Sequence, residues 1–68
     1  MSKLEMVKIP KANFTVVNAL LWLRENNYVM GHDAHEKNYY KFRQSPKKDN
    51  VKYFTKKLDN GILLVYEY

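Results

Sequence analysis

The sequence predicts a single small α+β domain over residues 1–68, with one amphipathic helix packed on a three- to four-stranded antiparallel sheet. Three observations indicate this class. Apolar residues recur with helical period over residues 13–26, apolar and polar residues alternate over residues 39–44, and Asn60-Gly61 separates two runs that are typical of paired strands. The expected order along the chain is strand, helix, strand, strand, strand.

The first strand is expected over residues 4–9, an apolar-rich stretch that Pro10 closes. Because proline has no backbone N–H to donate to a ladder, we expect this strand to be short and to lie near an edge of the sheet.

The helix is expected to begin after Asn13, whose side chain can cap the free amides of the first turn, and to stop at Asn26-Asn27 in a left-handed conformation. At 100° per residue, six apolar side chains fall within one half of the helical wheel and predict the face toward the sheet. They are Phe14, Val16, Val17, Leu20, Leu21 and Leu23.

Trp22 is the exception to this helical pattern, because it projects from the middle of the polar half. Two interpretations stay open. Either a loop or the N-terminal segment folds over the indole, or Trp22 is an anchor for a protein partner, as exposed tryptophan often is at interfaces.

The second strand is expected over residues 39–44, where alternation places Tyr40 and Phe42 on one face and Tyr39, Lys41 and Arg43 on the other. If the two apolar rings face inward, a row of one tyrosine and two cations faces outward.

The last two strands are expected to form a hairpin about Asn60-Gly61, a pair that readily adopts a two-residue type I′ turn. With this loop, Leu58 lies opposite Leu63 and Lys56 opposite Val65. The continuous apolar residues 62–65 predict an interior strand with the helix on one of its sides.

Residues 37–57 carry eight basic side chains, one acidic one and five aromatic ones, a net charge of +7 in a chain whose total is +5. Concentrated lysine and arginine attract polyanions, and interleaved aromatic rings offer stacking surfaces for bases. We therefore expect a nucleic-acid-binding strip, DNA or RNA, that makes mainly phosphate contacts. Its candidate residues are Tyr39, Lys41, Arg43, Lys47, Lys48, Lys52 and Lys56.

Residues 45–48, Ser-Pro-Lys-Lys, lie within this run and resemble the SPKK element of histone tails. That resemblance implies docking into A/T-rich minor grooves through a compact turn and two cationic side chains. The four residues also look like a proline-directed kinase site, and the remaining interpretation is an ordinary lysine-rich turn.

Catalysis is not expected, because the chain has no cysteine, no glycine-rich phosphate loop and no serine in a nucleophile turn. The segment of residues 32–36 contains His32, Asp33, His35 and Glu36, which are potential metal ligands, but one local cluster without a distant fourth ligand favours a polar surface loop. Both histidines have acidic neighbours, so a response to pH is a further alternative. No cofactor is expected.

The rival to nucleic-acid binding is a protein-binding regulator or inhibitor that engages an acidic surface, with Trp22 as its anchor. The abundance of lysine, asparagine and tyrosine, which have A/T-rich codons, is compatible with a phage or mobile element. The absence of cysteine fits a cytoplasmic location. No membrane segment is expected, since the longest apolar run, residues 19–23, is far below the roughly 20 residues of a span. Dense aromatic packing or self-association as a homodimer is the expected source of stability.

Overall fold

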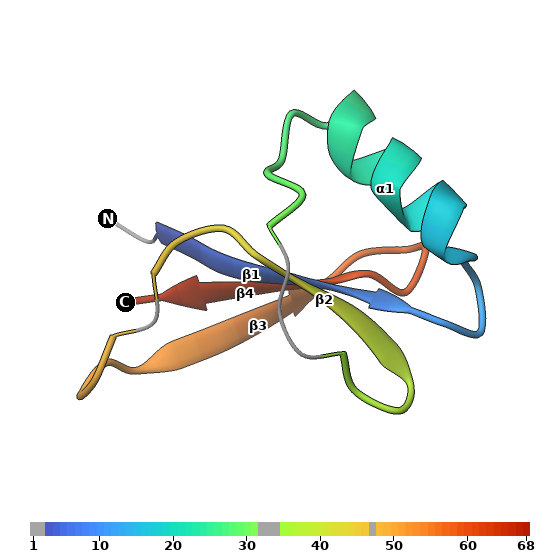
Figure 1. Ribbon diagram of the computed structural model, residues 1–68. Coiled ribbons are helices and arrows are strands. Elements are labelled where there is room, and N and C mark those ends of the chain that lie inside the picture. The colour runs from blue at the N-terminus through green and yellow to red at the C-terminus, as the bar shows by residue number, and fades with distance from the viewer. Residues whose placement is uncertain (1–2, 32–34, 47) are drawn as a thin grey trace.

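The computed structural model describes residues 3–31, 35–46 and 48–68. In chain order the elements are β1 (Lys3–Pro10), α1 (Val16–Glu25), β2 (Tyr39–Arg43), β3 (Tyr53–Lys57) and β4 (Leu63–Glu67). The strands form one antiparallel sheet in the order β2-β1-β4-β3, and α1 packs on one of its faces (Figure 1). The predicted α+β class and element order are therefore confirmed.

Strand β1 lies in the middle of the sheet, paired with β2 on one side and β4 on the other, so the prediction of a short strand near an edge is wrong. Pro10 is the last residue of the strand, and its missing N–H removes nothing from the interior of the ladder. The Pro10 carbonyl instead accepts from the backbone N–H groups of Asn13 at 3.2 Å and Phe14 at 3.1 Å. The proline therefore turns the chain toward the helix.

Helix α1 begins two residues later than predicted. Thr15 is its N-cap, and the Thr15 hydroxyl accepts from the backbone N–H of Asn18 at 3.2 Å. Asn13 serves the hairpin instead, because its side-chain amide donates to the Asn60 carbonyl at 3.2 Å. The left-handed stop is confirmed at Asn27, where φ is 61°.

The buried stripe of α1 is narrower than the predicted half-wheel. Ala19 and Leu23, one helical turn apart, are fully buried, whereas Val17 and Leu21 are 61% and 47% exposed. The helix thus packs on the sheet along a line of residues i and i+4, and the side chains of Val17 and Leu21 lie outside this contact. Trp22 is half-buried beside this stripe.

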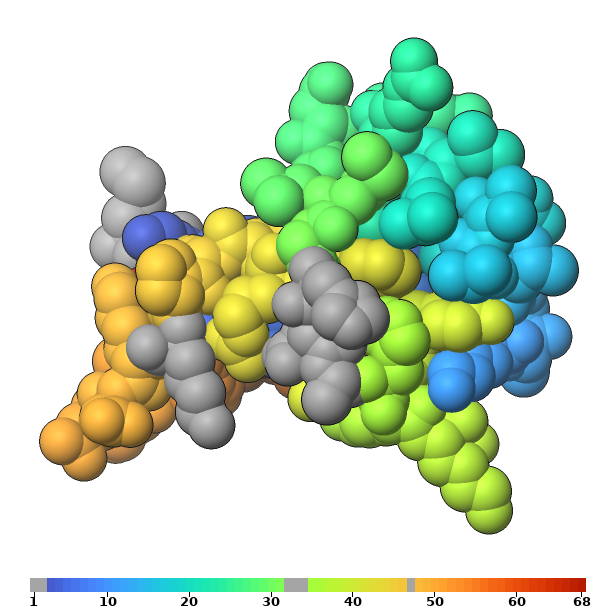
Figure 2. All heavy atoms as spheres, viewed as in Figure 1, coloured from blue at the N-terminus to red at the C-terminus, as the bar shows by residue number. Residues whose placement is uncertain are grey.

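The hydrophobic core lies between α1 and the face of the sheet that carries Val7. Tyr28, from the loop after the helix, stacks on Trp22 with ring centroids 5.6 Å apart, so a loop covers the indole. The buried residues of the core are Val7, Ile9, Ala19, Leu23, Phe42, Ile62 and Leu64. Figure 2 shows the helix and the segment leading into β3 at opposite sides of the molecule, with residues of β2 between them.

The β3–β4 hairpin exists as predicted, but its loop has three residues rather than two. The backbone N–H of Leu58 donates to the Ile62 carbonyl at 2.8 Å, and that of Gly61 donates to the Leu58 carbonyl at 3.0 Å. Within the loop of residues 59–61, only Gly61 has a positive φ, 89°, which fits a type I turn followed by a glycine bulge rather than a type I′ turn. The register therefore shifts by one residue, and Lys56 lies opposite Leu64 instead of Val65.

Candidate nucleic-acid interface

The face of the sheet opposite α1 is the candidate interface, and we call it the open face. Because strand side chains alternate and the register aligns the four strands, its residues follow from the pairing. They are Lys3, Met6 and Lys8 of β1, Tyr39, Lys41 and Arg43 of β2, Tyr53, Thr55 and Lys57 of β3, and Leu63, Val65 and Glu67 of β4.

A basic row crosses the open face. Lys41 of β2 pairs with Lys8 of β1, Lys8 pairs with Leu63 of β4, and Leu63 pairs with Lys57 of β3. Three of the four strands thus contribute a lysine at the same level of the sheet. Lys8 and Lys41 of this row lie on adjacent strands, whose backbones are about 4.8 Å apart.

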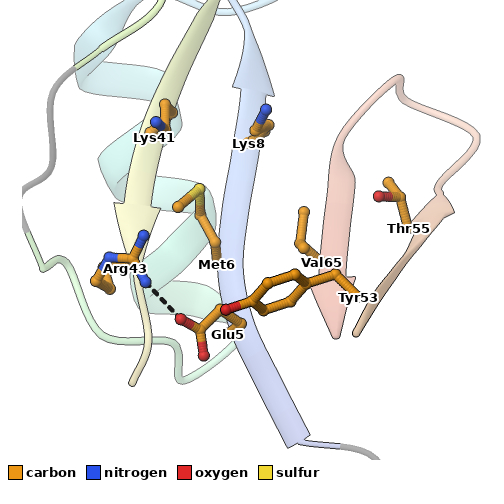
Figure 3. A pocket seen from close by; sticks show the side chains of 8 residues that line it. All are labelled: Glu5, Met6, Lys8, Lys41, Arg43, Tyr53, Thr55 and Val65. Atoms are coloured by element: carbon orange, nitrogen blue, oxygen red, sulfur yellow. Dashed lines mark hydrogen bonds and ion pairs between the residues drawn. The ribbon is translucent and has the colours of Figure 1, made fainter. Parts of the chain in front are cut away.

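The next row is less charged and leads into a pocket. Arg43, Met6, Val65 and Thr55 lie opposite one another across the four strands, and Tyr53 is two residues further along β3. Figure 3 shows the Tyr53 ring extending from β3 toward Glu5, beside Val65. The pocket has a volume of about 280 Å³. Its lining combines three cations and one carboxylate with an aromatic ring, a hydroxyl and apolar side chains: Glu5, Met6, Lys8, Lys41, Arg43, Tyr53, Thr55 and Val65.

Glu36 controls the charge of the basic row. Its Oε1 lies 2.7 Å from Nζ of Lys8 and 3.8 Å from Nζ of Lys41, so one carboxylate is shared by two ammonium groups. The hydrogen bond from Lys8 is the main cause of a lowered pKa for Glu36. Burial opposes this shift, and the charges of Lys8 and Lys41 act in the same direction as the hydrogen bond. Glu36 is therefore ionised at neutral pH, and the row keeps a positive excess.

Glu5 holds Arg43 in the neighbouring row. Glu5 is the extra residue of a bulge in β1 between Leu4 and Met6, and only 2% of its surface is exposed. The Arg43 guanidinium donates to one carboxylate oxygen, and the Ser45 hydroxyl donates to the other at 2.9 Å. This buried acceptor orients the guanidinium along the open face.

The predicted residues of β2 lie as expected, since Tyr39, Lys41 and Arg43 share the open face and Phe42 is buried on the other side. Lys56 does not join them. It lies opposite Leu64, on the face that carries the core.

Strands β2 and β3 are at opposite edges of the sheet, so the candidate residues of the predicted strip are divided between two strands that are not neighbours. The long connection between them allows β1 and β4, the most apolar strands, to take the central positions. Lys52 immediately precedes β3. Because it is four residues before Lys56, alternation places it on the same face as Lys56, away from the open face. Lys48 is exposed, and its Nζ lies 3.2 Å from Oε1 of Glu67. Lys47 is outside the described residues.

Sequence reasoning did not include Lys8 and Tyr53, which line the pocket, or Lys3 and Lys57, the other two cations of the open face. The signal for Lys8 was its position between Val7 and Ile9, because a lysine that alternates with apolar residues on a strand lies opposite the core. Tyr53 lies in the β3–β4 hairpin, and alternation alone does not predict that its ring is on the open face, because that depends on the strand order.

The potential metal ligands have other partners where the structure describes them. Nδ1 of His35 accepts from the backbone N–H of Lys41 at 3.0 Å, and the His35 ring packs edge-on against Tyr40 at 5.4 Å. His32 and Asp33 lie outside the described residues. Within the part of the chain that is described, no three metal-binding side chains come together.

Comparison with known proteins gives no match: no family model matches the sequence, and no curated protein or solved structure is significantly similar to it. Over residues 3–31, 35–46 and 48–68, no helix has the length and apolar character that crossing a bilayer requires.

Proposed function

We propose that this protein binds single-stranded nucleic acid across the open face of its sheet. The observation that carries the proposal is the placement of Lys8, Lys41 and Arg43 around one pocket with the ring of Tyr53. Ammonium groups neutralise phosphates, and an exposed ring stacks on an unpaired base.

The width of the sheet favours a single strand over a duplex. Four strands at a spacing of about 4.8 Å place the outer backbones about 14 Å apart. That width exceeds the roughly 12 Å of a major groove, so the open face cannot enter a duplex as a two-stranded ribbon does. An unpaired strand can instead lie across the sheet, as in other sheet-based modules.

Each side chain has a role in this proposal. Lys8 and Lys41 contact successive phosphates, Tyr53 stacks on a base, and Arg43 adds a planar donor whose orientation Glu5 sets. Because lysine contacts carry no base information, the binding should depend strongly on salt and weakly on sequence. We propose a purely binding role without catalysis, in the reducing cytoplasm that a chain without cysteine suits.

The test is fluorescence anisotropy with a labelled single-stranded DNA, its RNA counterpart and the matching duplex. The open face carries five cations, so binding of a single strand should weaken by up to about 130-fold between about 50 and 200 mM salt, at a slope of about −0.7 per phosphate. Lys8→Gln/Lys41→Gln should lower the slope by about 1.4 and the affinity at about 50 mM salt by about 60-fold.

The matched control is Lys52→Gln/Lys56→Gln, which removes the same charge from side chains off the open face. It should change the affinity by only a few fold. Equal losses in the two variants would refute the open face as the interface, and no binding at low salt would refute the proposed function.

A further inference from the structure

Strand β3 has an outer edge whose backbone groups have no partner among the described residues. Two hydrogen bonds define its orientation: the N–H of Leu58 donates to Ile62, and that of Tyr68 donates to the Lys52 carbonyl at 3.0 Å. In an antiparallel ladder, hydrogen-bonded pairs of residues alternate with pairs that are not hydrogen-bonded. The backbone N–H and C=O groups of residues 52, 54, 56 and 58 therefore point toward β4. The N–H and C=O groups of Tyr53, Thr55 and Lys57 therefore point outward.

The opposite edge of the sheet, at β2, is covered. The backbone N–H of Arg43 donates to the Gly31 carbonyl at 3.2 Å, that of Lys41 donates to Nδ1 of His35, and the Tyr39 carbonyl accepts from Glu36 at 3.0 Å. The segment before β2 thus supplies partners for three of the outward backbone groups of that strand. Only the β3 edge remains available to another chain among the described strands.

We propose that the β3 edge binds an extended acidic peptide segment of a partner protein as a fifth strand. Addition of a strand would supply partners for the outward groups of Tyr53, Thr55 and Lys57. The charge of the edge identifies the occupant. Lys52, Lys56 and Lys57 are exposed, and none of them has a carboxylate partner in the described structure.

Charge also argues against a second copy of this chain on the same edge. An antiparallel pair of β3 strands would bring two sets of these three lysines onto one seam, and edge lysines are a known protection against such pairing. An acidic segment removes the same repulsion and gains attraction to both faces, because Lys56 and Lys57 point to opposite faces of the sheet.

The side chains of β3 specify more than charge. Tyr53, 43% exposed, and Phe54 lie at the other end of the strand, and Phe54 stacks on Tyr66 with centroids 5.2 Å apart. A bound segment should therefore place two consecutive acidic residues beside Lys56 and Lys57 and two consecutive apolar residues beside Tyr53 and Phe54. One of each pair lies on either face of the extended sheet.

The test uses the whole protein and two labelled peptides, Glu-Glu-Thr-Val-Phe-Thr and its reverse, which allow for either strand direction. The decisive measurement is amide hydrogen exchange by NMR. On addition of the peptide that binds, the amides of Tyr53, Thr55 and Lys57 should exchange at least about tenfold more slowly. Those of Phe54 and Lys56, which already bond to β4, should change little. Unchanged exchange at the three outward amides would overturn the proposal.

Three comparisons separate strand addition from general attraction to acids. Peptides with lysine in place of glutamate should not bind, and equal binding would refute the role of charge. Thr55→Pro removes the central outward N–H without removing a ladder bond, so it should weaken binding by at least about tenfold. Should Thr55→Pro unfold, the exchange measurement on the unchanged protein still decides.

The third comparison separates the edge from the open face. Lys56→Gln should weaken peptide binding and spare nucleic acid, whereas Lys8→Gln/Lys41→Gln should do the reverse. If Lys8→Gln/Lys41→Gln weakened peptide binding and Lys56→Gln did not, the peptide would bind the open face and the proposal would be refuted.

Discussion

Replacing Glu36 by glutamine is expected to strengthen nucleic-acid binding, although it removes an interaction that the folded protein makes. In the native chain the Glu36 carboxylate contacts Lys8 at 2.7 Å and Lys41 at 3.8 Å. The amide of glutamine has nearly the same shape and no charge. The ammonium groups of Lys8 and Lys41, two of the three lysines of the basic row, are then free to bind phosphates.

The size of the gain follows from the charge that is released. The substitution adds one net positive charge to the row, equivalent to about one more phosphate contact. For single strands, the logarithm of the binding constant falls with the logarithm of the salt concentration at a slope of about −0.7 per phosphate contact. One more contact therefore raises the affinity at about 50 mM salt by about eightfold, when affinities are compared with those at about 1 M salt, and steepens the slope by about 0.7. Eightfold is an upper value, because the exposed carboxylate is already screened by solvent.

The assay is the same anisotropy titration, with Glu25→Gln as the matched control. Glu25 is the exposed last residue of α1, which lies on the other side of the sheet, and its replacement changes the net charge equally. An unchanged or weaker affinity for Glu36→Gln, or an equal gain for both variants, would refute the role of the basic row.

The pH dependence of this effect has a defined sign. The folded-state pKa of Glu36 is lowered from its ordinary value of 4.5, so its stabilising contribution is complete above that value and is lost as the pH falls through the lowered pKa. The difference in affinity between Glu36→Gln and the native protein should therefore persist from about pH 8 to about pH 5, because Glu36 stays ionised over that range.

Four further substitutions test the fold on which these surfaces depend. Leu23→Ala should lower the free energy of unfolding in urea by about 2–5 kcal/mol, because Leu23 is fully buried, whereas Leu21→Ala should change it by less than about 0.5 kcal/mol. Gly61→Ala should cost about 1 kcal/mol or more, since φ is 89° there and the added methyl would lie 3.0 Å from the side-chain amide of Asn13. Trp22→Phe should leave nucleic-acid affinity within about twofold while lowering stability, because Trp22 packs against the helix side of the sheet.

Local patterns predicted those features that depend on few residues. Alternation over residues 39–44 identified the buried face of β2, and the asparagine pair after the helix predicted the left-handed stop that Asn27 makes. These features depend on the period of a strand and on the backbone preference of one residue type. Tertiary packing did not overrule either of them.

The features that failed depend on competition between distant segments. The propensity of Asn60-Gly61 for a type I′ turn lost to a three-residue loop, in which Asn13 donates to the Asn60 carbonyl and Leu58 pairs with Ile62. The helical wheel marked Leu21 as buried because periodicity reports an apolar half, whereas the sheet contacts only the stripe of Ala19 and Leu23. Neither outcome is visible without the partner segments.

The basic run of residues 37–57 shows why charge in sequence does not identify a ligand. The two strands within this run, β2 and β3, lie at opposite edges of the sheet, so their lysines have different neighbours. Lys41 and Lys8 lie on either side of the Glu36 carboxylate, beside the pocket that Tyr53 lines. This combination of cations and an aromatic ring suits a ligand that carries both phosphates and bases. Lys56 and Lys57 flank unpaired backbone groups, and that combination suits a strand with acidic side chains. Because the two sets differ in their neighbours and share the same charge, neutral substitutions in each set should separate the two ligands.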